Sequence, residues 1–92
     1  SVSTLTPRIP PHVADVIRGL HPDIRRLISE AVRELCVRPH LGDPLKRELE
    51  GLWKYRVRRY RIVYEIDSPS RELRLFAVRH RESIYDSLTR RP

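Results

Sequence analysis

The sequence predicts an α+β fold in which an N-terminal helical hairpin packs on one face of a small sheet of about four strands. The predicted order is β-α-α-β-β-β with a short C-terminal helix, and the sheet is antiparallel except at the mixed first strand. Two observations predict it: the first half repeats apolar residues at the spacing of a helical face, and the second half alternates apolar and basic residues with a period of two. The chain has the length of one domain, so we expect residues 1–92 to form a single unit around one core.

The first half predicts a short strand within residues 1–8 and then two helices. The first helix begins at Pro10-Pro11, where prolines suit a first turn, and ends at Gly19. The second follows the break at His21-Pro22, and the short connection predicts a helical hairpin. The apolar stripes of the two helices are Val13, Val16, Ile17 and Leu20, then Ile24, Leu27, Ile28, Ala31 and Leu35.

The second half predicts three strands after a loop at residues 39–44 and an ambiguous stretch at residues 45–51. Alternation in residues 53–66 predicts a hairpin with Trp53, Tyr55 and Val57 on one face and Lys54, Arg56 and Arg58 on the other. On the returning strand, Tyr60, Ile62, Tyr64 and Ile66 share a face, whereas Arg61, Val63 and Glu65 share the opposite one. The third strand runs from Glu72 to Arg79 as a central strand covered on both sides, with Leu73, Leu75 and Ala77 on one face and Arg74, Phe76 and Val78 on the other. Residues 83–88 predict the terminal helix.

Composition narrows the function classes. The single cysteine excludes an internal disulfide, and no apolar run is long enough to cross a bilayer, so we expect a cytoplasmic protein without membrane contact. The formal net charge is +7, and most of the excess lies in residues 45–92. A basic sheet suits a polyanionic partner, although a solvated basic surface would give the same composition.

The candidate site is the sheet face that the helices leave open. It carries Lys54, Arg56 and Arg61, with Arg81 and Tyr85 farther along the chain. Basic side chains around one phosphate can stabilise the extra charge of a phosphoryl transition state, and a tyrosine can stack on an RNA base. The four histidines are scattered singly, so we expect no metal and no cofactor. Without a metal, the natural reaction is attack of the RNA 2′-hydroxyl on the adjacent phosphate, although each arginine taken alone is more often a solvated strand residue.

Three runs of sequence, residues 45–57, 60–67 and 78–85, together resemble the RelE/ParE toxin superfamily on its RelE side. The resemblance covers about half of the chain and agrees with the expected order of elements. It implies the toxin of a type II toxin–antitoxin system, an endoribonuclease that cuts mRNA in the ribosomal A site without a metal. It also implies that a small antitoxin wraps the toxin in a hetero-oligomer.

The resemblance also implies roles for individual residues. Lys54 and Arg61 match basic residues that stabilise the transition state, Arg81 matches the proposed general acid, and Tyr85 matches the aromatic that orients the message. Arg56 stands where well-studied members carry a lysine that acts as general base. A guanidinium keeps its proton in proteins, so this departure makes Lys54, crowded by arginines, an alternative base.

Further residues carry less specific expectations. Asp43 and His80 lie roughly where some relatives place a carboxylate and a histidine for the acid–base roles. Arg58 and Arg59 replace a glycine-containing turn of many relatives and would add phosphate contacts, with Lys46 and Arg47 as further RNA-binding residues.

Three functions remain open at this stage. The first is the ribosome-dependent endoribonuclease. The second is a gyrase-inhibiting toxin of the ParE branch, which lacks this basic and aromatic set. The third is a non-catalytic RNA- or protein-binding domain of the same fold, which the arginine at position 56 keeps open.

Overall fold

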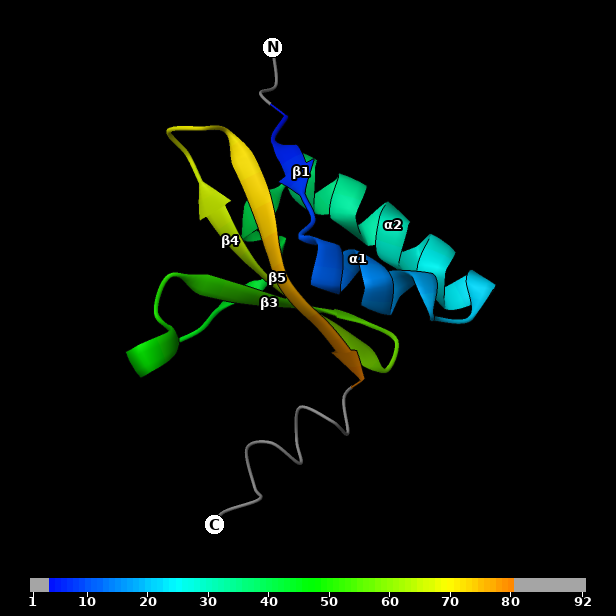
Figure 1. Cartoon of the computed structure of the whole chain (residues 1–92). Coiled ribbons are helices and arrows are strands. Elements are labelled where there is room, and N and C mark those ends of the chain that lie inside the picture. Colours follow the sequence, from blue (N-terminus) through cyan, green and yellow to red (C-terminus); the bar gives the residue numbers. More distant parts are fainter. Residues whose placement is uncertain (1–3, 81–92) are drawn as a thin grey trace.

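The computed structural model describes residues 4–80 as two helices packed on one face of a five-stranded sheet (Figure 1). The sheet order is β1-β5-β4-β3-β2. The predicted α+β class and the order of its main elements are confirmed, and the predicted terminal helix at residues 83–88 lies outside the described residues. The elements are β1 (Thr6–Arg8), α1 (Pro11–Arg18), α2 (Pro22–Val37), β2 (Asp43–Pro44), β3 (Leu52–Val57), β4 (Tyr60–Asp67) and β5 (Glu72–His80), with 3-10 turns at Pro39–Leu41 and Arg47–Leu49.

Both helices form where the apolar stripes predict them, and local signals set their ends. Each begins with a proline in its first turn, where a missing N–H does no harm. Gly19 ends α1, and its N–H bonds back to Asp15 and Val16 carbonyls. At the start of α2 the His21 ring nitrogen accepts a hydrogen bond of 3.1 Å from the Asp23 N–H. The hairpin covers one face of the sheet and leaves the other open.

The sheet is antiparallel apart from its first strand, as the sequence predicts. Thr6 pairs with Glu72 in a parallel register, so the N-terminal strand lies beside the last described one. β3 and β4 form a hairpin joined by Arg58-Arg59, and β4 pairs with β5 along its whole length. β2 is an addition that the sequence did not predict, because two residues, one of them Pro44, carry no alternation.

The core lies between the hairpin of helices and the covered face of the sheet. Its fully buried side chains come from α1, α2, β4 and β5, and partly buried aromatic residues of β3 pack against them. The largest of these fully buried side chains are Tyr64, Ile28, Leu35, Ile62, Leu73, Leu75 and Val13.

A β-bulge in β5 changes which side chains face the core. Val63 pairs with Ala77 and Tyr64 with Leu75, so Phe76 has no partner of its own on β4. Val78 is therefore buried and Ala77 is not, the reverse of the predicted alternation beyond Leu75. The prediction that both sides of this strand are covered is also wrong, because Arg74 and Phe76 are both exposed.

The loop before β2 is held by Tyr64. Its hydroxyl donates a 2.6 Å hydrogen bond to the Pro39 carbonyl and accepts a 3.2 Å bond from the Gly42 N–H. Gly42 approaches the sheet so closely that a Cβ there would lie 2.5 Å from the Lys54 carbonyl oxygen and 2.6 Å from the Tyr64 hydroxyl. This contact fixes where β2 begins and places Asp43 opposite Lys54.

Stability should fall in alkaline solution because two buried groups resist ionisation. Burial raises the pKa of the Tyr64 phenol and of the Cys36 thiol. The two groups contribute fully to the free energy of unfolding below their pKa values in the unfolded chain, about 8.5 for cysteine and about 10 for tyrosine. This contribution is lost as the pH rises through their higher pKa values in the folded protein. Urea unfolding at increasing pH should show the free energy of unfolding decreasing above about pH 9, and less so in Cys36→Ala. A constant value over this range would contradict the expectation.

Candidate functional site

A row of three arginines crosses the open face of the sheet. Arg56 of β3 lies directly opposite Arg61 of β4, and Arg61 lies directly opposite Arg79 of β5. Directly opposite residues share a face, with Cβ atoms about 5 Å apart. Among the described residues none of the three forms an ion pair with an acidic side chain. Three like charges at this spacing repel one another, so the arginine row is a site that an anion would stabilise.

Lys54 extends the arginine row along β3. It is two residues from Arg56, about 7 Å along the strand, and on the same face. Its neighbours across the sheet are Asp43 of β2 and Val63 of β4. Asp43 is exposed at the sheet edge, so the structure brings together one lysine, one carboxylate and the arginine row.

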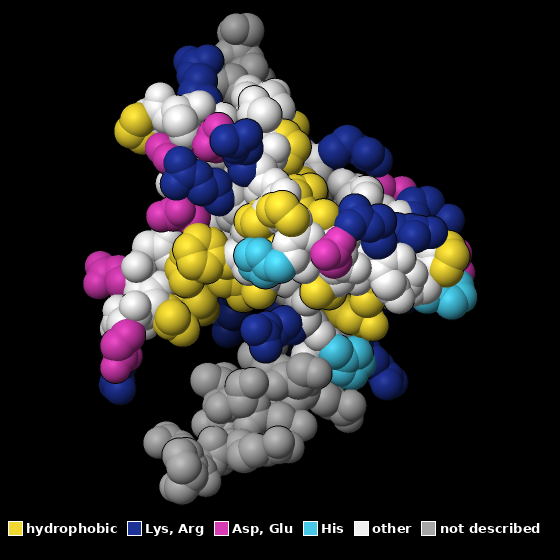
Figure 2. All heavy atoms as spheres, viewed as in Figure 1, with side chains coloured by type: hydrophobic (Ala, Val, Ile, Leu, Met, Phe, Trp, Pro, Cys, Tyr) yellow, Lys and Arg dark blue, Asp and Glu magenta, His cyan; other side chains and the backbone are white. Residues whose placement is uncertain are grey.

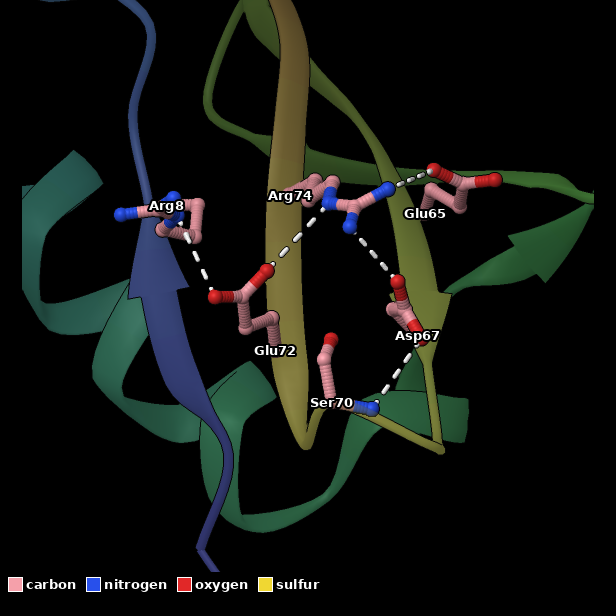
Figure 3. Close-up of polar contacts among 6 residues, drawn as sticks. All are labelled: Arg8, Glu65, Asp67, Ser70, Glu72 and Arg74. Carbon is pink, nitrogen blue, oxygen red and sulfur yellow. Dashed lines mark hydrogen bonds and ion pairs between the residues drawn. The ribbon is translucent and has the colours of Figure 1, made fainter.

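The other half of the open face is electrically balanced. Arg74 of β5 forms ion pairs with Glu65 at 3.6 Å, Asp67 at 2.7 Å and Glu72 at 3.4 Å (Figure 3). Glu72 also pairs with Arg8 of β1 at 3.3 Å. These side chains, which we call the ion-pair network, leave Arg74 little free charge for a ligand.

The open face therefore has two electrostatic halves. Figure 2 shows basic and acidic side chains mixed in the upper part of the molecule and basic side chains without adjacent acidic ones near the lower end of the sheet. The first part corresponds to the turn between β4 and β5, and the second to the end of β5. Among the described residues, the arginine row therefore lies in the half where no acidic side chain pairs with it.

The β3–β4 turn carries two more of the predicted residues. Arg58 and Arg59 are both exposed, and the Arg58 backbone adopts φ 58°, a region that glycine occupies more readily. The Arg56 side chain donates a 3.1 Å hydrogen bond through Nε to the Arg58 carbonyl. The turn thus holds Arg56 in place at one end of the arginine row.

Three predicted residues lie away from the arginine row. Lys46 and Arg47 belong to the connection between β2 and β3, at the opposite end of β3 from Arg56, with Glu48 beside them. His80 pairs with Tyr60, and the two rings meet edge to face with centroids 5.2 Å apart. This contact lies on the helix side of the sheet, so the fold does not bring His80 to the face that carries Arg61.

Two predicted residues, Arg81 and Tyr85, lie outside the described residues. The structure adds Arg79, which sequence reasoning missed because simple alternation assigns it to the face of Leu73 and Leu75. The bulge at Phe76 reverses that assignment. A signal was present: Phe76, Ala77 and Val78 are three consecutive apolar residues, where the strict alternation of the strand breaks down.

Metal and membrane features are absent from the part of the chain that is described. Within residues 4–80 no group of three or more His, Cys, Asp and Glu side chains is arranged to hold a metal ion. None of the helices described there has the length and apolar character needed to span a membrane.

Comparison with known proteins identifies the family. The model of the ParE toxin of the type II toxin–antitoxin system parDE matches residues 13–85. No curated protein sequence matches the chain. The Mycobacterium tuberculosis toxin–antitoxin complex RelBE2 contains a similar structure, with a TM-score of 0.79, 28% sequence identity and coverage of 88% of this chain and 95% of that one.

Two further solved structures share the fold. A mutant of the E. coli toxin RelE in the free state has a TM-score of 0.76 at 17% identity and covers 92% of each chain. A YoeB/ParE toxin from Agrobacterium tumefaciens has a TM-score of 0.72 at 19% identity, over 83% of this chain and 98% of that one. The family match spans most of the chain and the fold agrees with it. The protein therefore belongs to the ParE toxin family, within the RelE/ParE superfamily of type II toxins.

Proposed function

We propose that this toxin is a ribosome-dependent endoribonuclease that cleaves mRNA in the A site and so inhibits translation. The observation that carries the proposal is the arginine row with Lys54 beside it, a set of cations on one face with no acidic ion-pair partner among the described residues. A scissile phosphate needs such a set to stabilise the negative charge that it gains in the transition state. The proposed site of action is the cytoplasm, where translating ribosomes are found.

The proposed reaction needs no metal. The 2′-oxygen of the message attacks the adjacent phosphorus as a base removes its proton, and the 5′-oxygen leaves as an acid protonates it. The phosphate gains negative charge in the transition state, and cations fixed around it stabilise that charge more than they stabilise the ground state. Arg61, flanked by Arg56 and Arg79, and Lys54 supply this stabilisation in the proposal.

The proposed reaction also needs a general acid and a general base near the arginine row. Arg56 is a poor base because its guanidinium keeps its proton, so Lys54 and Asp43 are the proposed candidates. Arg81 as acid and Tyr85 as the stacking residue are carried by the resemblance alone.

A second candidate function is inhibition of gyrase, because the matching family model is described as that of the ParE toxin. A third is binding without catalysis, which would follow if Arg56 has removed the only competent base. Neither accounts for the arginine row as directly as a scissile phosphate does.

A cognate antitoxin is the proposed partner. The similar M. tuberculosis structure is of a toxin–antitoxin complex. With a net charge of +7, the toxin suits a small acidic protein that covers the open face and forms a hetero-oligomer with it.

Primer extension on a translated message separates the three functions. The wild-type toxin should produce discrete cuts within codons only when ribosomes translate the message, and Arg81→Ala should not. The same protein should leave gyrase supercoiling activity unchanged. Inhibition of supercoiling without RNA cleavage would support the ParE function instead, and neither effect would support the non-catalytic domain.

A further inference from the structure

We propose that Phe76 forms a nucleobase subsite, on which a base of the message near the scissile phosphate stacks. The proposal rests on the proposed function, since it takes single-stranded RNA as the ligand. It concerns a residue to which the family resemblance assigns no role.

Phe76 is an exposed aromatic residue within a regular strand, next to the bulge. Its side chain keeps 50% of its surface accessible, although it lies in the middle of a strand that is otherwise buried at Leu75 and Val78. Bulges re-aim side chains and are over-represented beside active sites. Here the extra residue shifts the register beyond Leu75, so that Arg79 instead of Val78 lies opposite Arg61.

Two hollows meet at Phe76. One, of about 680 Å³, is lined by residues of β1, the start of α1 and β5, and the other, of about 450 Å³, by residues of α1, β4 and β5. Phe76 and His12 line both of them. Each volume lies in the range of small-molecule pockets, and a base resting on the phenyl ring would have the His12 ring available in the same space.

Arg79 gives the second hollow a positive charge that suits an anionic ligand. Within residues 4–80, all the ionisable side chains that line the hollows except Tyr60 are basic or imidazole groups, and no carboxylate lines either hollow. Arg79 lies three residues from Phe76 on β5, about 10 Å along the strand. A phosphate at the arginine row and a base on Phe76 could therefore belong to neighbouring nucleotides. Arg8 and Arg74, which line the first hollow, belong to the ion-pair network, whereas Arg79 lines the second hollow and has no ion pair among residues 4–80.

An aromatic ring favours RNA over a protein occupant at this position. Every base has a π-face, so stacking on a phenyl ring tolerates any sequence, which suits a toxin that must act on many messages. The exposed aliphatic residues beside the hollows, Ile9 and Val16, would serve a protein partner equally well. We therefore make a protein occupant one of the outcomes of the test.

The test compares two polyanions that differ only in having bases. The probes are a 2′-O-methyl oligoadenylate of about ten nucleotides, which cannot be cleaved, and inorganic polyphosphate of matched charge. Phe76→Leu should weaken binding of the oligoadenylate by about tenfold and leave polyphosphate binding and the salt dependence of both unchanged, because no phosphate contact is lost. Phe76→Tyr should retain the affinity. Arg79→Gln should weaken both probes.

The matched control is Leu49→Ala, which removes an equally exposed apolar side chain, 49% accessible, from the 3-10 turn of the β2–β3 connection. It should leave both affinities unchanged, and circular dichroism should show every variant folded. Equal affinity of wild type and Phe76→Leu for the oligoadenylate would overturn the subsite. The subsite would also be overturned if Phe76→Leu weakened binding only to an acidic antitoxin segment, because Phe76 would then be part of a protein interface. Because no ribosome or cleavage is involved, failure of the nuclease proposal would be seen separately, in primer extension.

Discussion

Replacing Arg61 by alanine should lower the rate of ribosome-dependent mRNA cleavage by about 100- to 1,000-fold, the usual effect of removing one preorganised group that stabilises charge in the transition state. Arg61 is the central member of the arginine row, with Arg56 and Arg79 directly opposite on either side. It is also partly buried, unlike these two neighbours. Its charge is therefore the least screened by water and the best placed to meet a phosphate between the three strands.

The same substitution should not unfold the protein. Removing the middle charge relieves two contacts between like charges, so the thermal unfolding temperature of Arg61→Ala should equal or exceed that of the wild type. The matched control is Arg33→Ala, which removes an exposed arginine from α2 on the other layer and should cleave normally. Arg61→Lys should keep part of the activity because the charge remains. A folded Arg61→Ala with wild-type cleavage would remove the arginine row from the mechanism.

Gly42→Ala should lower the free energy of unfolding by about 2 kcal/mol or more, within the range observed when a methyl group is forced into a packed site. The new Cβ would lie 2.5 Å from the Lys54 carbonyl oxygen, a backbone atom of β3 that cannot move without disturbing the sheet. It would also lie 2.6 Å from the Tyr64 hydroxyl, which holds the loop before β2. We expect β2 to separate from β3 and Asp43 to leave its place opposite Lys54.

Gly19→Ala is the matched control for this prediction. Gly19 ends α1 with φ −81°, which any residue can adopt, and a Cβ there would meet its nearest neighbour at 3.6 Å, an ordinary contact. Urea unfolding should give this variant a stability close to that of the wild type. Tyr64→Phe removes one of the two clashing atoms, so its effect combined with Gly42→Ala should be smaller than the sum of the two single effects. Equal stability of the two glycine variants would contradict the prediction, because it would show that the β3 backbone shifts at Lys54 and makes room for the added methyl group.

The fold could be predicted from the sequence where one periodicity continues over several turns or strand residues. The apolar stripes of α1 and α2 and the alternation of β3 and β4 each depend on neighbouring residues, and the structure confirms them. β2 escaped prediction because Asp43 and Pro44 become a strand only by pairing with Lys54 and Trp53. The bulge escaped because it depends on the register between β4 and β5, which is a long-range property.

The candidate site could be predicted to the same extent. Lys54, Arg56 and Arg61 share a face because a strand alternates, and this follows from local sequence alone. Arg79 joins them only through the bulge. Lys46 and Arg47 are near the basic run in sequence, and His80 follows Arg79, but none of them joins the arginine row. A strand length separates the first two from Arg56, and the sheet itself separates His80 from Arg61. The sequence thus predicted the face of the basic residues on β3 and β4 but not the face of Arg79 on β5.

The parallel pairing of β1 with β5 also bears on how the protein is made. Thr6 pairs with Glu72, near opposite ends of the described chain, so β1 cannot join the sheet before β5 has been synthesised. Arg79 belongs to the same late strand. A nascent toxin therefore lacks a complete arginine row until translation has passed Arg79.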